Sequence, residues 1–124
     1  MTKGRIRAVG IDFEKRIADK TRTQITDQIL HGSEHQVLAN HTGDLNTIFT
    51  LIFSAKESFF KAAHDEVQRY FGFEALKLVS IDPQNQILHF EIQETLSASY
   101  VSGMAVQVYY QLIDDKSVAT LCYF

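Results

Sequence analysis

The chain has 124 residues, of which 45% are hydrophobic and 22% charged, and its 12 Lys and Arg against 15 Asp and Glu give a net charge of −3. This composition excludes a disordered chain, and the length predicts a single domain over residues 1–124. Because the charges are balanced and no basic cluster occurs, nucleic acid is not expected as a partner. The single cysteine and the lack of a long apolar run exclude a disulfide-rich secreted scaffold and a membrane span, and predict a cytoplasmic protein.

The first part of the chain predicts one strand and two short helices. A β-branched run predicts a strand over residues 6–12, and apolar spacing predicts a helix over residues 21–30. Ser33 followed by Gln36 is a capping-box pattern, so we expect a second short helix over residues 34–40.

The remainder of the chain predicts a long helix and four strands. Asp44 is a favourable N-cap, and the apolar residues between 45 and 63 predict a helix that is buried nearly all round. Turn-forming segments then separate strand-like segments, which predicts two β-hairpins, 76–81 with 87–92 and 105–112 with 118–123. This order predicts an α+β fold in which the long buried helix packs on a mostly antiparallel sheet.

Two carboxylates stand at the end of the first predicted strand. Asp12 and Glu14 are two residues apart, so their side chains project from the same face of that strand. Such a pair repels itself unless a cation lies between, and oxygen ligands suit Mg²⁺. The alternative is an ordinary, solvated strand end.

Three charged residues interrupt the most apolar part of the long predicted helix. Glu57 and Lys61 are four residues apart, so a surface ion pair between them is one explanation, while Lys56 faces elsewhere. The surrounding phenylalanines leave little polar face for these charges. A third carboxylate that meets Asp12 and Glu14, with lysines ready for phosphate oxygens, is the second explanation.

The two motifs together resemble a known family. The segments Gly-Ile-Asp-Phe-Glu (10–14) and Phe-Ser-Ala-Lys-Glu-Ser-Phe-Phe-Lys (53–61) are similar to the 4′-phosphopantetheinyl transferases, and most resemble the enterobactin-synthase and surfactin-synthetase type. The segments at 70–73 and 114–121 also resemble the C-terminal part of that group. The resemblance covers nearly the whole chain and implies one phosphopantetheinyl-transferase lobe.

This resemblance implies Mg²⁺-dependent transfer of the phosphopantetheine arm from coenzyme A to a serine of an acyl or peptidyl carrier protein. The matching metal ligands are Asp12, Glu14 and Glu57, and the matching residues near the coenzyme A phosphates are Lys56 and Lys61. The carrier serine must also lose a proton.

By analogy with the family, three groups are candidates to accept that proton. They are Glu57, a metal-bound water and Glu34 at the start of the second short helix. For Glu34, a solvated first-turn glutamate that favours the helix dipole remains the alternative.

The chain departs from the long family type in one respect. Members of that type resemble two similar halves in one chain, and this sequence matches the second half only. We therefore expect either a missing N-terminal half or self-association into a homo-oligomer, because large apolar surfaces rarely stay bare. The alternative function is a non-catalytic lobe or remnant that binds a carrier protein or a partner subunit.

Overall fold

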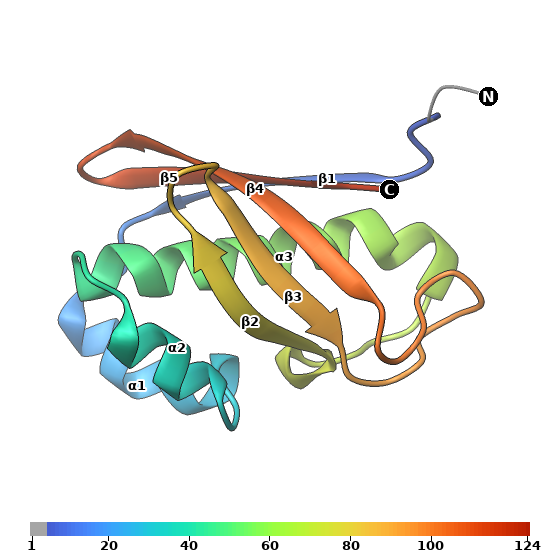
Figure 1. The fold of residues 1–124 in the computed structure, drawn as a ribbon, viewed down its shortest axis with the longest axis horizontal. Coiled ribbons are helices and arrows are strands. Elements are labelled where there is room, and N and C mark those ends of the chain that lie inside the picture. The colour runs from blue at the N-terminus through green and yellow to red at the C-terminus, as the bar shows by residue number, and fades with distance from the viewer. Residues whose placement is uncertain (1–4) are drawn as a thin grey trace.

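A computed structural model describes residues 5–124 of the chain. The elements follow in the order β1 (Val9–Lys15), α1 (Asp19–Ile29), α2 (Glu34–Asn40), α3 (Leu45–Val67), a short 3-10 helix η1 (Phe73–Ala75), β2 (Leu76–Asp82), β3 (Ile87–Ile92), β4 (Ala105–Asp114) and β5 (Ser117–Tyr123). This arrangement confirms the α+β fold with both expected hairpins and the long helix (Figure 1). None of the helices in residues 5–124 is long and apolar enough to cross a membrane.

The strands form one five-stranded sheet in the order β1-β5-β4-β3-β2, and every neighbouring pair is antiparallel. β1 and β2 are therefore the two edge strands. α3 runs along one face of the sheet and contacts β1, β5 and β4, whereas α2 contacts β2 (Figure 1). β1 and α3, which are far apart in the sequence, thus lie side by side.

Two local expectations are wrong. β1 covers Val9–Lys15 rather than residues 6–12, because its pairing with β5 continues to the Lys15–Ser117 pair. The Ser33 side chain makes no capping hydrogen bond to α2. Instead, the Glu34 carboxylate turns back and accepts a hydrogen bond of 2.9 Å from the backbone N–H of His31.

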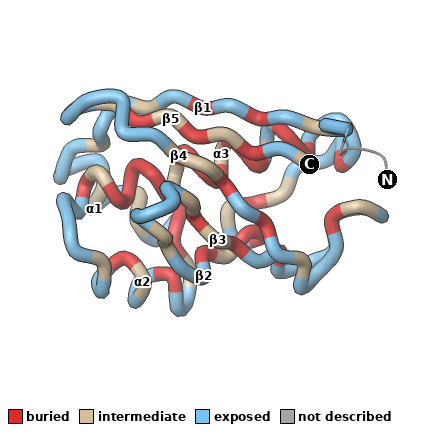
Figure 2. The backbone as a smooth tube through the Cα atoms, turned by 45° about the horizontal axis from the view of Figure 1, so that its top comes forward, coloured by how far each residue is buried: buried red, intermediate tan, exposed pale blue. Residues whose placement is uncertain are grey.

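α3 supplies most of the core. It begins as expected, because the Asp44 carboxylate accepts a hydrogen bond of 2.9 Å from the backbone N–H of Thr47. Its apolar side chains then pack against the inner face of the sheet, and those with no exposed surface are Phe49, Leu51, Ile52, Ala55, Phe59 and Ala63. Figure 2 shows the buried stretches of α3 and of the strands turned toward one another.

Gly10 allows β1 to lie against α3. A Cβ atom at this position would stand 1.9 Å from the carbonyl oxygen of Ser58 and 2.7 Å from the backbone nitrogen of Ala62. No side chain fits there, so this glycine sets the distance between the strand that carries Asp12 and the helix that carries Glu57.

Candidate active site

Asp12 lies in the seam between β1 and α3. It belongs to the face of β1 that turns toward the helix, and only 5% of its surface is exposed. Its Oδ1 accepts a hydrogen bond of 2.9 Å from the ammonium of Lys61, while its Oδ2 has no hydrogen-bond partner among the described residues. A buried carboxylate oxygen without a donor is costly, so this atom is suited to bind a cation or a donor brought by a ligand.

Lys61 reaches from α3 to the edge strand. Its Nζ donates to the carbonyl oxygen of Ile11 at 3.0 Å as well as to Asp12, and its side chain remains 52% exposed. The surface ion pair between Glu57 and Lys61 does not form in the described structure, since Lys61 pairs with Asp12 instead. Glu57 and Lys61 are four residues apart in α3, as the interpretation required, but the ammonium of Lys61 binds the buried carboxylate of Asp12 on the neighbouring strand.

Glu14 and Glu57 complete a group of carboxylates around Lys61. Burial and, after it, the neighbouring Asp12 and Glu57 together raise the pKa of Glu14 to about 7, and Lys61 opposes them. Burial also raises the pKa of Glu57, with Asp12 next in importance and Lys61 again opposing. The three carboxylates therefore act on one another electrostatically.

The donor set suits a hard divalent cation that is bound partly by a ligand. Within residues 5–124, no three or more acidic, histidine or cysteine side chains form a group that could hold a metal ion. Mg²⁺ in phosphate-transfer sites is commonly held by one or two carboxylates together with phosphate and water. The unpartnered Oδ2 of Asp12 and the mutual repulsion of the carboxylates fit such an ion.

A buried cluster of hydroxyl groups lies directly behind Asp12. Thr120, which pairs with Asp12 across β5 and β1, donates to the carbonyl oxygen of Ser54 at 3.0 Å and contacts the hydroxyl groups of Ser54 and Ser58. These residues join α3 to the sheet where the acidic residue sits. Sequence reasoning missed them, although two serines four residues apart inside an apolar helix were a signal.

Lys56 and Glu34 occupy the opposite side of α3, inside the protein. Their side chains are 0% and 1% exposed and form an ion pair of 2.8 Å. The Lys56 ammonium also donates to the carbonyl oxygens of Ile29 and Phe73, at 2.8 and 3.1 Å. The second oxygen of Glu34 accepts from the backbone N–H of Leu78 at 2.7 Å.

This placement differs from the expected one. A phosphate ligand for Lys56 and a carrier serine for Glu34 would both have to enter the interior, because every polar atom of the pair is already bonded there. The structure brings together Asp12, Glu14, Glu57 and Lys61, and separates Lys56 and Glu34 from them. The alternative interpretation of Glu34 as a solvated first-turn glutamate is also wrong, because its carboxylate is buried.

The chain matches known proteins over nearly all of its length. The family model described as the 4′-phosphopantetheinyl transferase superfamily matches residues 8–121. Enterobactin synthase component D of Escherichia coli O157:H7 is 35% identical over 114 residues, which cover 92% of this chain and 48% of that protein. The same component of Salmonella typhi is 36% identical over 81 residues, which cover 65% of this chain and 34% of that protein. The chain thus spans about half the length, or less, of these curated relatives.

A solved structure has the same fold. Holo-acyl-carrier-protein synthase of Thermotoga maritima superposes with a TM-score of 0.59 at 18% sequence identity, covering 96% of this chain and 63% of that one. At this identity the likeness concerns the fold alone. Together with the carboxylates that the fold gathers at the β1–α3 seam, the family match leads to one identification: the chain belongs to the 4′-phosphopantetheinyl transferase superfamily.

Proposed function

We propose that this chain is a phosphopantetheinyl-transferase lobe that moves the 4′-phosphopantetheine arm from coenzyme A to a serine of an acyl or peptidyl carrier protein. The serine oxygen forms a bond to the phosphorus that carries the arm, and the bond from that phosphorus to the bridging diphosphate oxygen breaks. The products are the modified carrier protein and 3′,5′-ADP, and the serine proton passes to a carboxylate. We place this reaction in the cytoplasm, because the single cysteine cannot form a disulfide within the chain and a reducing compartment keeps its thiol reduced.

The observation that carries the proposal is the meeting of Asp12, Glu14 and Glu57 around Lys61. These carboxylates would hold Mg²⁺, which would neutralise the diphosphate and the charge that develops on the departing phosphate. Lys61 is half exposed and has donor capacity beyond Asp12 and Ile11, so it is placed to bind a phosphate oxygen of coenzyme A.

Glu57 is the proton acceptor in this proposal. Its pKa is raised by burial and by Asp12, which makes its carboxylate a stronger base than a solvated glutamate. Lys56 and Glu34 contribute indirectly, because their interior ion pair ties α3 to α2, η1 and β2. Neither residue contacts the substrates in this assignment.

A second lobe is expected to complete the enzyme. The outer face of β1 and β5 carries large apolar side chains that are 42–70% exposed: Val9, Ile11, Phe13 and Tyr123. The relatives are about twice as long as this chain, so a second lobe, either one like the other half of the relatives or another copy of this chain, would cover that face. The same observation supports the alternative function, in which the chain alone is non-catalytic and binds a carrier protein or a partner subunit.

The test is a transfer assay on the chain itself. The protein is incubated with coenzyme A, Mg²⁺ and an apo carrier protein, and mass spectrometry measures the added mass of the arm. We expect the unmodified chain to transfer the arm. In Glu57→Gln the rate of transfer should fall by about 100-fold or more, because general acid–base catalysis contributes on that scale. Glu91→Gln, which changes an exposed carboxylate on β3, is the matched control and should retain activity.

Two results would contradict the proposal. If the unmodified chain transfers no arm even at high protein concentration, the alternative of a non-catalytic lobe replaces it. If transfer proceeds but Glu57→Gln and Glu91→Gln behave alike, Glu57 is not the proton acceptor.

A further inference from the structure

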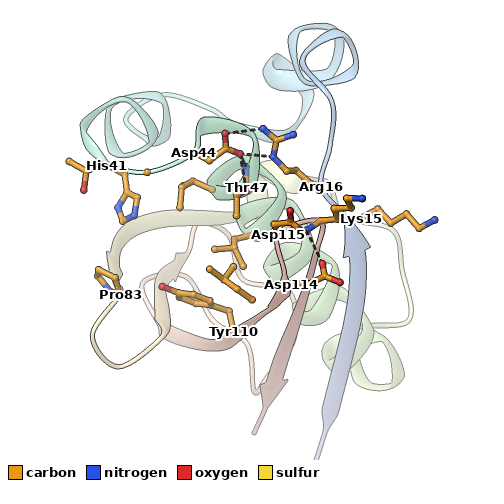
Figure 3. Close-up of a pocket in the computed structure, with 15 residues that line it drawn as sticks. Lys15, Arg16, His41, Asp44, Thr47, Pro83, Tyr110, Asp114 and Asp115 are labelled. Atoms are coloured by element: carbon orange, nitrogen blue, oxygen red, sulfur yellow. Dashed lines mark hydrogen bonds and ion pairs between the residues drawn. The ribbon is translucent and has the colours of Figure 1, made fainter.

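A large cavity opens at the end of the sheet where β4 turns into β5 (Figure 3). Its volume is about 900 Å³, within the range of small-molecule sites. The end of β1, the loop before α3, the first turns of α3, the β2–β3 turn and the β4–β5 hairpin all line it. None of Asp12, Glu14, Glu57 and Lys61 does, so the cavity is separate from the candidate active site.

The floor of the cavity is an open part of the interface between helix and sheet. Val106 and Val108 on the inner face of β4 are buried, but Leu112, further along the same face, is 47% exposed. The first turns of α3 present Ile48 and Leu51 to the same space. An aliphatic group placed there would be removed from water by side chains that already belong to the core.

The charges around the cavity cancel. Three cationic residues line it against three aspartates: Lys15, Arg16 and Lys116 against Asp44, Asp114 and Asp115. Arg16 is held by Asp44 in two hydrogen bonds of 2.6 and 2.8 Å, and Asp114 accepts the backbone N–H of Lys116 at 2.7 Å. A rim without net charge offers no advantage to an anionic or a cationic ligand.

Several polar groups of the lining remain available to a ligand, among them the side chains of His41, Thr42 and Tyr110. The ring of His41 and the hydroxyl group of Tyr110 make no hydrogen bond to the described part of the chain, and both lie on the side of the cavity near Pro83 (Figure 3). Between them they can donate and accept a hydrogen bond. Each of the two can therefore bond to an amide or hydroxyl group of a ligand.

We propose that this cavity binds a neutral aliphatic molecule with one terminal amide or hydroxyl group, about the size of a medium-chain fatty amide. The proposal goes beyond the transfer reaction and does not depend on it. The alkyl chain lies on Ile48, Leu51 and Leu112, and the polar end meets His41 and Tyr110.

The test compares three probes with the same chain and different ends. Octanamide, octanoate and octylammonium are titrated into ¹⁵N-labelled protein, and NMR follows the backbone N–H signals of Thr47, Tyr110 and Leu112. We expect saturable shifts with octanamide, and an affinity at least about threefold higher than for either charged probe. No saturable shift at these residues, or a charged probe that binds best, would overturn the proposal.

A matched pair of variants locates the site. Leu112 and Ile113 are neighbours on β4 with 47% and 49% exposure, but only Leu112 lines the cavity. Leu112→Asp should lower octanamide affinity about tenfold or more, because it places a charge in the apolar floor, whereas Ile113→Asp should leave it within about twofold. Equal losses in the two variants would overturn the assignment.

A milder variant keeps the test decisive if Leu112→Asp does not fold. Tyr110→Phe removes only the hydroxyl group and should lower octanamide affinity about threefold, with little effect on octylammonium. An unchanged preference among the three probes in Tyr110→Phe would contradict the role of that hydroxyl.

Discussion

Lys56 and Lys61 are the same residue type, five positions apart in one helix, and their surroundings are opposite. Lys56 has no exposed surface and four oxygen contacts within the protein, while the side chain of Lys61 is 52% exposed and pairs with the buried Asp12 from the solvent side. The sequence predicts that both need partners, because both interrupt an apolar helix. It could not say which lysine turns inward, since that depends on which neighbour offers carbonyl oxygens and a buried carboxylate.

At the residue scale, the Lys56–Glu34 pair predicts a specific pattern of stability. Lys56→Met should lower the free energy of unfolding by about 3–5 kcal/mol, because it leaves the Glu34 charge buried without its partner. The double variant Lys56→Met with Glu34→Gln should recover part of this loss, since no unpaired charge remains. Urea denaturation measures the free energy of unfolding of the unmodified chain, the single variant and the double variant.

The control for this pattern is Lys20→Met, which changes an exposed lysine of α1 and should alter stability by less than about 0.5 kcal/mol. A double variant that is no more stable than Lys56→Met would show that the unpaired charge is not the cause.

The helices and hairpins could largely be predicted from the sequence, because their periodicity and turn residues are local signals. Asp44 caps α3 as expected, and both hairpins form. The Ser33 side chain makes no cap because the backbone of Ser33 is already helical, and the backbone N–H of Gln36 donates to the Ser33 carbonyl oxygen instead. The acidic residues Asp12, Glu14 and Glu57 could be singled out from the sequence, and their role as metal ligands stays a prediction. The Lys61–Asp12 pair and the Thr120 cluster could not be predicted, since they cross between elements.

At the element scale, the contact between β1 and α3 rests on Gly10. Gly10→Ala should destabilise the fold by at least about 1–3 kcal/mol, because the new methyl group would meet backbone atoms of Ser58 and Ala62 that cannot move independently. Under the proposed function, it should also weaken the binding of coenzyme A with Mg²⁺, since the strand carrying Asp12 is pushed away from Glu57. Thermal denaturation and calorimetric titration measure the two effects.

Gly72→Ala is the matched control. A Cβ atom there would meet only the side chain of Glu74, which can turn away, and the backbone φ of −86° suits alanine. Equal destabilisation by the two substitutions would show that the close approach of the α3 backbone to Gly10 is not the cause of the lost stability.

For the whole molecule, the uncovered outer face of the sheet sets the expected state of association. Phe13 is 70% exposed and stands among Val9, Ile11 and Tyr123 on that face. If a second copy covers it, Phe13→Asp should shift the chain from oligomer to monomer in analytical ultracentrifugation, because a charge in an apolar interface is costly.

Val79→Asp serves as the control, since Val79 is 51% exposed but lies on the opposite edge strand, β2. It should leave the sedimentation coefficient unchanged. A wild-type chain that is monomeric at all concentrations would show that a second copy does not cover this face.

The strands that carry the two ends of the described chain are joined to each other. The backbone N–H of Phe124 donates to the carbonyl oxygen of Ala8 at 3.0 Å, and the N–H of Ala8 donates back to Phe124 at 3.2 Å. A reporter group attached near either residue therefore occupies the same spot, at the end of β1 away from the Lys15 side of the large cavity (Figure 1). The same closure makes the fold suited to circular permutation: a short linker between these residues would let the chain be opened at the β2–β3 turn with every strand pairing retained.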